Sequence, residues 1–315
     1  MKDRNALTVI LAAAAVLLFS GCRAVNGLDP ISNVPADNAG SGEKTEGDIN
    51  GRKYLPSVEE IVLDDGWKYA EHAVVNTGAA VLYRASENGD AEDGLPAGKD
   101  PVIAVNAGHG TVGGEEKEVY CHPDKTPKLT KGSNPKGSLK AVAVAAGMIF
   151  ADGTTEAEAA LRVARMLRER LLDDGYDVLM IRDDQDVQLD NVARTVIANN
   201  KADCLVSLHF DGDGMNYDKG CFYIPVPDEI KGMDPVSDIW REHERLGEAL
   251  LKGLRKHGCR MYDGRIDALE LTQTCYATIP AVVVELGNAK SDISDAQLKK
   301  TADGLADGIE AYFGK

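Results

Sequence analysis

From residue 101 onward, short apolar runs alternate along the chain with amphipathic stretches. Apolar residues between 159 and 171 recur at three- and four-residue steps, which predicts one buried face of a helix. Further helices are expected over 192–198, 246–254 and 295–312. Helices that alternate with apolar strands predict an α/β fold, with a largely parallel sheet covered on both faces. The expected strands are Val102–Val105, Asp177–Ile181, Cys204–Leu208, Cys221–Val226 and Ala281–Val284.

The beginning of the chain has the pattern of an export signal. Lys2 and Arg4 precede an apolar run over 6–19, which is too short for a comfortable transmembrane helix of about 20 residues. The ending Leu18–Cys22 resembles a bacterial lipobox. We therefore expect residues 1–22 to be a lipoprotein signal peptide and Cys22 to be lipidated. The protein would then be exported and lipid-anchored to the outer face of the bacterial cell membrane; simple secretion and an uncleaved anchor are the alternatives.

Two segments separate this signal from the main domain. Residues 23–53 are rich in Gly, Asn, Asp and Ser and predict a flexible tether. Residues 54–100 contain the apolar pieces Ile61–Leu63 and Ala79–Tyr83, which we interpret as strand fragments of a small N-terminal add-on of unknown role. The main domain then covers 101–315, including an insertion over 111–153 with little periodicity.

Composition and charge narrow the range of functions. A hydrophobic content of 43% excludes global disorder and allows a sizeable core. Lys and Arg number 35 against 51 Asp and Glu, so the formal net charge is −16. Such a chain is a poor candidate for binding nucleic acid through its phosphates, and no nucleic-acid partner is expected. We expect a monomer.

Polar residues follow three of the expected strands at their carboxyl ends, where reactive groups gather in open α/β sheets. His109, His209 and Glu285 stand at these positions, and Glu156 opens the first long helix. Two histidines and one carboxylate, with a fourth position for water, are the ligands of a catalytic zinc ion. A second carboxylate could then act as general base.

Alternative roles exist for each candidate. His109 could be an ordinary loop histidine, His209 a core histidine, and Glu285 the partner of a buried arginine. Thr155 and Glu158 have the spacing of a capping box, which would leave Glu156 free to face a metal. His122, beside a cysteine, is the one rival ligand.

The motifs together resemble the zinc-dependent N-acetylmuramoyl-L-alanine amidases, bacterial cell-wall hydrolases of amidase type 3. The resemblance covers about 101–313, with its motifs in the family's order. It implies a twisted sheet of about six strands, zinc held by His109, Glu156 and His209, and a catalytic Glu285. The expected reaction is hydrolysis of the amide bond between N-acetylmuramic acid and L-alanine in peptidoglycan. The matching stretches are Val102–His109, Glu156 with Leu161 and Ala164, Asp177–Arg182, Ala202-Asp203, Val206–His209 and Ile279–Gly287.

The chain also departs from the family's pattern. A long insertion follows Gly110, and Ala160 and Asn288 replace the usual asparagine and aromatic residue. Substrate-binding residues are therefore unassigned. We expect the insertion to act as a lid or substrate wall, because both its ends lie next to proposed zinc ligands; a solvated surface excursion is the alternative. A zinc peptidase or other amide hydrolase with the same site, and an inactive wall-binding lipoprotein, are the alternative functions.

Overall fold

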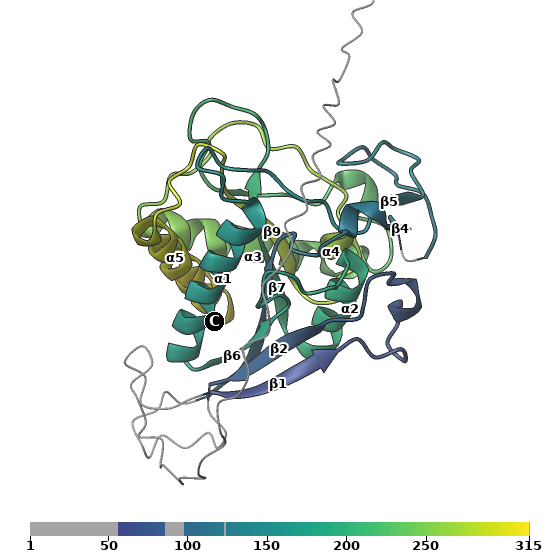
Figure 1. Ribbon diagram of the computed structural model, residues 1–315, viewed down its shortest axis with the longest axis horizontal. Helices are drawn as coiled ribbons and strands as arrows, with labels where there is room; N and C mark the ends of the chain where they lie inside the picture. Colours follow the sequence, from purple (N-terminus) through teal and green to yellow (C-terminus); the bar gives the residue numbers. More distant parts are fainter. Residues whose placement is uncertain (1–55, 86–97, 123, 315) are drawn as a thin grey trace, which may run out of the picture. The chain divides into compact units, whose positions relative to one another are not determined.

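The computed structural model describes residues 56–85, 98–122 and 124–314 (Figure 1). The expected signal peptide, the tether and Cys22 lie outside these residues. None of the helices in the described ranges is both long enough and apolar enough to span a lipid bilayer.

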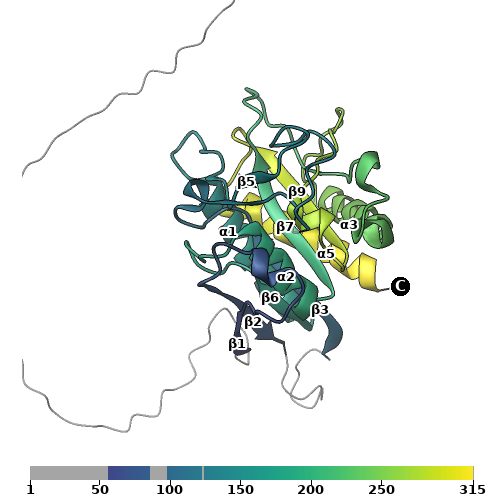
Figure 2. The same ribbon diagram turned by 90° about the vertical axis from the view of Figure 1, so that its right-hand side faces the viewer.

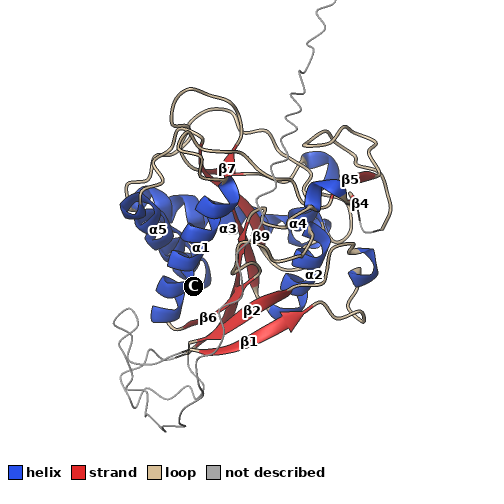
Figure 3. Cartoon of the chain, viewed as in Figure 1, coloured by secondary structure: helices blue, strands red, loops and turns tan. Residues whose placement is uncertain are grey.

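A mixed sheet of seven strands forms the centre of the described fold, in the order β1-β2-β6-β3-β7-β9-β8 (Figure 3). The four inner strands β6, β3, β7 and β9 run parallel, and the outer strands pair antiparallel. This confirms the expected α/β fold, with seven strands in place of about six. The strands are β1 (Ser57–Val62), β2 (Ala79–Arg84), β3 (Lys99–Ala107), β6 (Tyr176–Met180), β7 (Cys204–Asp211), β8 (Phe222–Tyr223) and β9 (Ala281–Asn288).

Strands β1 and β2 change the interpretation of the segment before residue 101. β2 pairs with β6, so that Leu82 lies opposite Leu179. Ala80 and Leu82 are buried in the same apolar cluster as Leu179 and Ile61. The strand fragments are therefore not a separate add-on but the edge of the main sheet. Pairing between strands about 100 residues apart leaves no local pattern in the sequence, which is why the boundary was misplaced.

Helices cover both faces of the sheet (Figure 2). α1, α3 and α5 pack together on one face, while α2 and α4 lie on the other. Ile103 and Val105 of β3 face α1, and Ala104 between them faces α2, as the alternation of side chains along a strand requires. The helices are α1 (Glu156–Asp173), α2 (Asn191–Lys201), α3 (Val236–Lys256), α4 (Thr272–Cys275) and α5 (Asp295–Phe313).

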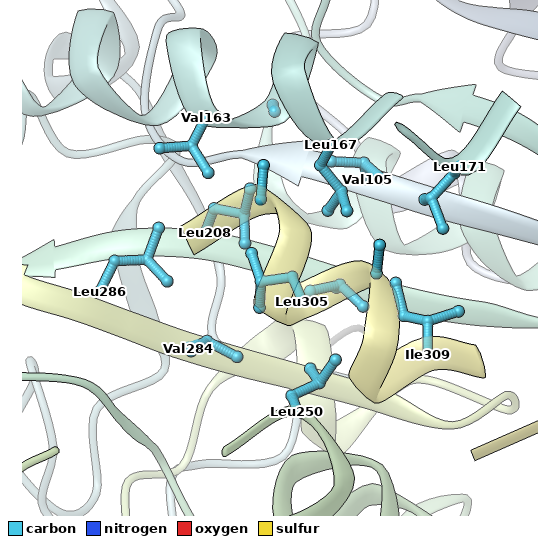
Figure 4. Packing of buried hydrophobic residues seen from close by; sticks show 14 of the residues in the cluster. Val105, Val163, Leu167, Leu171, Leu208, Leu250, Val284, Leu286, Leu305 and Ile309 are labelled. Atoms are coloured by element: carbon cyan, nitrogen blue, oxygen red, sulfur yellow. The ribbon is translucent and has the colours of Figure 1, made fainter. Parts of the chain in front are cut away.

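The larger apolar core lies between the sheet and the helices α1, α3 and α5 (Figure 4). Leu167 of α1, Leu208 of β7 and Leu305 of α5 are completely buried there. Each such side chain contributes about 1.5–3 kcal/mol relative to an exposed one. This packing holds β3, β7 and β9 side by side, so that their carboxyl ends form one rigid edge.

The insertion over 111–153 is more regular than expected. It contains a two-stranded antiparallel ribbon of β4 (Glu118–Tyr120) and β5 (Lys140–Val142). Val119 and Ala143 of the insertion are buried against Val192 and Val196 of α2. These contacts attach the base of the insertion to the main fold, while most of its residues between 124 and 142 are exposed or partly exposed.

Candidate metal centre and active site

Three predicted ligands meet at the carboxyl ends of the parallel strands. His109 lies two residues after β3, Glu156 is the first residue of α1, and His209 belongs to β7. The Oε1 atom of Glu156 is 2.8 Å from His109 Nε2 and 3.0 Å from His209 Nδ1. The two imidazole nitrogens are 3.1 Å apart. In the described part of the chain, these three residues are the group whose ligand atoms are arranged to hold a metal ion.

The start of α1 aims Glu156 at this point. Thr155 and Glu158 form the expected capping box: the Thr155 hydroxyl accepts from the Glu158 N–H, and the Glu158 carboxylate accepts from the Thr155 N–H. Glu156 therefore takes no part in the helix cap, and its carboxylate can point toward the two histidines. Its Oε1 accepts from the backbone N–H of Phe210, and its Oε2 from that of Met148, each at 3.0 Å. The carboxylate is held in one orientation.

His109 is fixed by contacts of its ring and of its backbone. Its Nδ1 donates to the carbonyl of Ala145 at 2.7 Å, which leaves the Nε2 lone pair directed at the cluster. The residue itself has a φ of 61°, which a non-glycine side chain rarely adopts. Close packing also requires two glycines: a Cβ on Gly108 would lie 2.4 Å from the His209 ring, and one on Gly147 would lie 2.8 Å from Glu156.

Two buried arginines hold the loop that carries His109. Arg194 donates to the carbonyl of His109 at 2.6 Å, and Arg182 donates to the carbonyls of Gly108 and Ala157. Burial lowers the pKa of Arg182 to about 10 and that of Arg194 to about 9. Both remain charged at neutral pH, and their donors satisfy backbone carbonyls at the end of β3. Arg194 stands out in the sequence as a lone charge within the apolar stretch 192–198, a signal that sequence reasoning missed.

The donor set fits a zinc ion. Zinc–nitrogen and zinc–oxygen bonds of about 2.0–2.1 Å in a tetrahedron separate neighbouring ligand atoms by about 3.3 Å, close to the three observed separations. Burial lowers the pKa of His209, although the hydrogen bond to Glu156 opposes this, and favours the neutral ring that binds metals. Burial acts to raise the pKa of Glu156, but its contacts with the imidazole rings of His109 and His209 outweigh burial and lower that pKa well below its usual value. Glu156 is therefore ionised, the state in which a carboxylate can bind a metal ion.

Glu285 lies on β9 directly opposite His209 of β7 and lines the same cleft as both histidines. Its side chain is almost completely buried, and its Oε2 has no hydrogen-bond partner among the described residues. Burial raises its pKa, and the negative charges of Glu156 and Asp211 raise it further, while Lys219 opposes the shift. No arginine pairs with Glu285 in the described structure, so the ion-pair alternative is wrong and a carboxyl group is left free to exchange a proton.

The cleft beside the metal cluster has a volume of about 520 Å³. One wall is formed by the insertion, through β4, β5 and neighbouring residues; the other is formed by residues 269–273 with Ile224 and Val283. The insertion therefore forms one wall of the cleft, and its action as a lid or substrate wall stays a prediction.

Other residues noted in the sequence have structural roles. His122 does not join the cluster but pairs with Glu270, at 2.5 Å. Asn288, which replaces the family's aromatic residue, is buried and donates to Asp213 and to the carbonyl of Tyr217, so it supports the loop after β7. Ala160 is buried in the core face of α1.

Comparison with known proteins agrees with this architecture. The sequence profile of the N-acetylmuramoyl-L-alanine amidases matches residues 103–311. The N-acetylmuramyl-L-alanine amidase Ami1 of Mycobacterium abscessus superimposes with a TM-score of 0.56 at 21% identity, over 68% of this chain and 98% of that one. Ami1 of Mycobacterium smegmatis gives 0.56 at 19% identity, over 68% and 97%. A search of curated proteins finds no match.

The family match, on the α/β fold described above, identifies a hydrolytic enzyme of the bacterial cell wall. The profile match covers well over half of the chain, and the chain therefore belongs to the N-acetylmuramoyl-L-alanine amidase family. The resemblance inferred from the sequence motifs, and the enzyme class with it, are confirmed.

Proposed function

We propose that the protein is a zinc-dependent hydrolase that cleaves the amide bond between N-acetylmuramic acid and L-alanine in peptidoglycan. One observation carries the proposal: three converging metal-ligand atoms and a buried, unpartnered carboxyl oxygen of Glu285 share one open cleft. Membership of the amidase family supports the choice of bond.

His109, Glu156 and His209 would hold the zinc ion. Bound zinc supplies a Lewis acid for the scissile carbonyl and lowers the pKa of a coordinated water to about 7. The Ala145 carbonyl fixes the His109 tautomer, and two backbone N–H groups fix the Glu156 carboxylate, so the ligands need little rearrangement.

Glu285 is the proton carrier in this mechanism. As carboxylate it accepts a proton from the attacking water, and as carboxylic acid it passes that proton to the leaving amine of L-alanine. Burial and the nearby negative charges raise the pKa of Glu285, which favours the protonated form that hands a proton to the leaving amine. Glycan strands with a free lactyl carboxylate and a stem peptide with a free amine are the products.

Digestion of purified peptidoglycan, followed by mass analysis of the soluble products, tests this function. We expect intact stem peptides that begin with a free L-alanine amine, and glycan without peptide. Loss of activity on dialysis against a chelator, and its return with zinc, would support the metal requirement. Peptide fragments cut between amino acids would instead identify a peptidase, and an intact wall would contradict hydrolysis.

We also propose that the protein is exported and lipid-anchored through Cys22, which the lipobox-like sequence Leu18–Cys22 supports. Peptidoglycan lies outside the membrane, so export would bring the enzyme to this substrate. Metabolic labelling with a fatty acid should mark the wild type but not Cys22→Ser, and the variant should leave the membrane fraction. A Cys22→Ser variant that still sediments with membranes would indicate an uncleaved apolar anchor.

A further inference from the structure

The insertion contributes one lysine to the cleft in an unusual setting. Lys128 is only 5% exposed, yet it lines the same cleft as His109, His209 and Glu285. The neighbouring lysines Lys125 and Lys131 are exposed to solvent. Of these three, Lys128 alone lines the cleft.

The ammonium group of Lys128 has no counter-charge in contact with it. Within the described residues, no carboxylate oxygen lies within 4.0 Å of its Nζ, and the side chain makes no hydrogen bond. Glu270 also lines the cleft, but its carboxylate accepts from the N–H groups of Leu129 and Thr130 and pairs with His122. The carboxylate of Glu270 is thus engaged by groups other than Lys128.

An ammonium group this deeply buried is costly unless an anion or several acceptors compensate it. Lys128 lines the cleft, and a Cβ on Gly132 would lie 3.3 Å from its Nζ and 3.8 Å from the backbone nitrogen of Glu270, another residue of the cleft wall. A ligand with an anionic group would complete the pairing. Such a pair, shielded from bulk water, is also stronger than one on the surface.

We propose that Lys128 forms an anion subsite of the cleft and binds a carboxylate of the peptide part of the substrate. The assignment rests on the proposed function, because the peptide stem of peptidoglycan carries carboxylates on the side of the scissile bond away from the sugar. Lys128 therefore selects stem peptides with a free carboxylate over amidated ones.

The test compares Lys128→Met with Lys131→Met, a matched loss of an exposed lysine in the same insertion. Methionine keeps the unbranched stem of Lys128, so the wall should stay packed; unchanged metal content and melting temperature would verify this. Calorimetry then measures binding of the tripeptide L-alanyl-D-glutamyl-diaminopimelate and of the same peptide with its carboxyl groups amidated. Inorganic phosphate serves as a second anion.

Lys128→Met should bind the free tripeptide about tenfold to hundredfold more weakly than wild type, the range expected for a hydrogen bond to a charged group. It should bind the amidated peptide like the wild type, and Lys131→Met should match the wild type with both. On carboxylate-bearing substrate, the change should appear in KM more than in kcat. Equal losses for both peptides, no loss, or a loss for phosphate alone would each overturn the carboxylate assignment.

The binding measurement separates this proposal from the function on which it rests. A protein that binds the tripeptide through Lys128 but releases no stem peptide from peptidoglycan would contradict the amidase reaction and keep the anion subsite. If wild type and Lys128→Met cleave peptidoglycan equally well, the amidase reaction is supported and the anion subsite is contradicted.

Discussion

The molecule contains two buried pairs of histidine and glutamate that look alike in composition and differ in chemistry. At the strand ends, His109 Nε2 lies 2.8 Å from Glu156. In the insertion wall, His122 Nε2 lies 2.5 Å from Glu270, and both side chains there are only 1% exposed. Each pair joins residues that are distant in the sequence.

The two pairs differ in the other groups that contact them. Glu270 accepts from two backbone N–H groups of the insertion, and the second nitrogen of His122 bonds the Thr126 hydroxyl, so the pair fastens the insertion to residues 269–273. Glu156 and His109 instead meet a third ligand, His209, beside an open cleft. The number of converging donors and access from solvent, rather than residue type, distinguish the candidate metal centre from the His122–Glu270 pair.

The largest expected effect comes from removing a ligand. His109→Ala or His209→Ala leaves two protein ligands, so zinc affinity should fall by more than about 100-fold, beyond the loss typical of outer-shell changes. Hydrolysis should disappear with the metal. His122→Ala is the matched control and should retain one zinc per chain by elemental analysis. Full metal occupancy in both ligand variants would refute the comparison.

A change at Glu285 should separate metal binding from catalysis. Glu285→Gln keeps the shape of the side chain but cannot accept a proton, so kcat should fall by about 10²- to 10⁴-fold. Zinc content should stay the same, because Glu285 lies outside the cluster of three ligands. Steady-state kinetics with metal analysis on the same sample measures both; turnover near that of the wild type would place the base elsewhere.

Disrupting the His122–Glu270 pair should lower the free energy of unfolding and leave metal binding at His109, Glu156 and His209 unchanged. Glu270→Gln weakens the hydrogen bonds that the buried carboxylate accepts from the N–H groups of Leu129 and Thr130, which should cost about 1–3 kcal/mol. Urea denaturation should show this loss, while zinc content remains at the wild-type level. Loss of zinc from Glu270→Gln would instead show that the His122–Glu270 pair supports the proposed ligands His109 and Glu156.

His243 is buried like His122 but pairs with no carboxylate among the described residues, and it should show a smaller effect that depends on pH. His243 donates from Nε2 to the Thr274 carbonyl and accepts at Nδ1 from the Ala281 N–H, and burial lowers its pKa to about 4. The unfolded chain takes up a proton near pH 6.5 and the folded chain only near 4. The neutral ring therefore stabilises the fold above pH 6.5, and this contribution falls with pH between these values, by up to about 3 kcal/mol.

His243→Gln can keep both hydrogen bonds without titrating. Between pH 7 and pH 4, the free energy of unfolding should fall further in the wild type than in this variant. Parallel pH profiles for the two proteins would show that His243 is not held neutral.

Much of the site was predictable from the chain alone. The strand ends predicted the positions of His109, His209 and Glu285, because parallel strands deliver their carboxyl ends to one edge of a sheet. The capping-box spacing separated Glu156 from Glu158. Other features of the site depend on contacts between distant segments, which leave no local pattern in the sequence. These are the two arginines that hold the His109 loop, the contact of His109 with the Ala145 carbonyl, and the pairing of His122 with Glu270.

The sequence by itself determined the α/β class, the amidase family and the three residues proposed as metal ligands, since periodicity, capping and short motifs are local properties. Only the tertiary structure decided that β1 and β2 complete the sheet, that the insertion folds into a cleft wall, and that Lys128 rather than Lys125 or Lys131 faces the cleft. Burial and pairing in these regions follow from packing between residues far apart in the chain, and packing geometry exists only once the chain has folded.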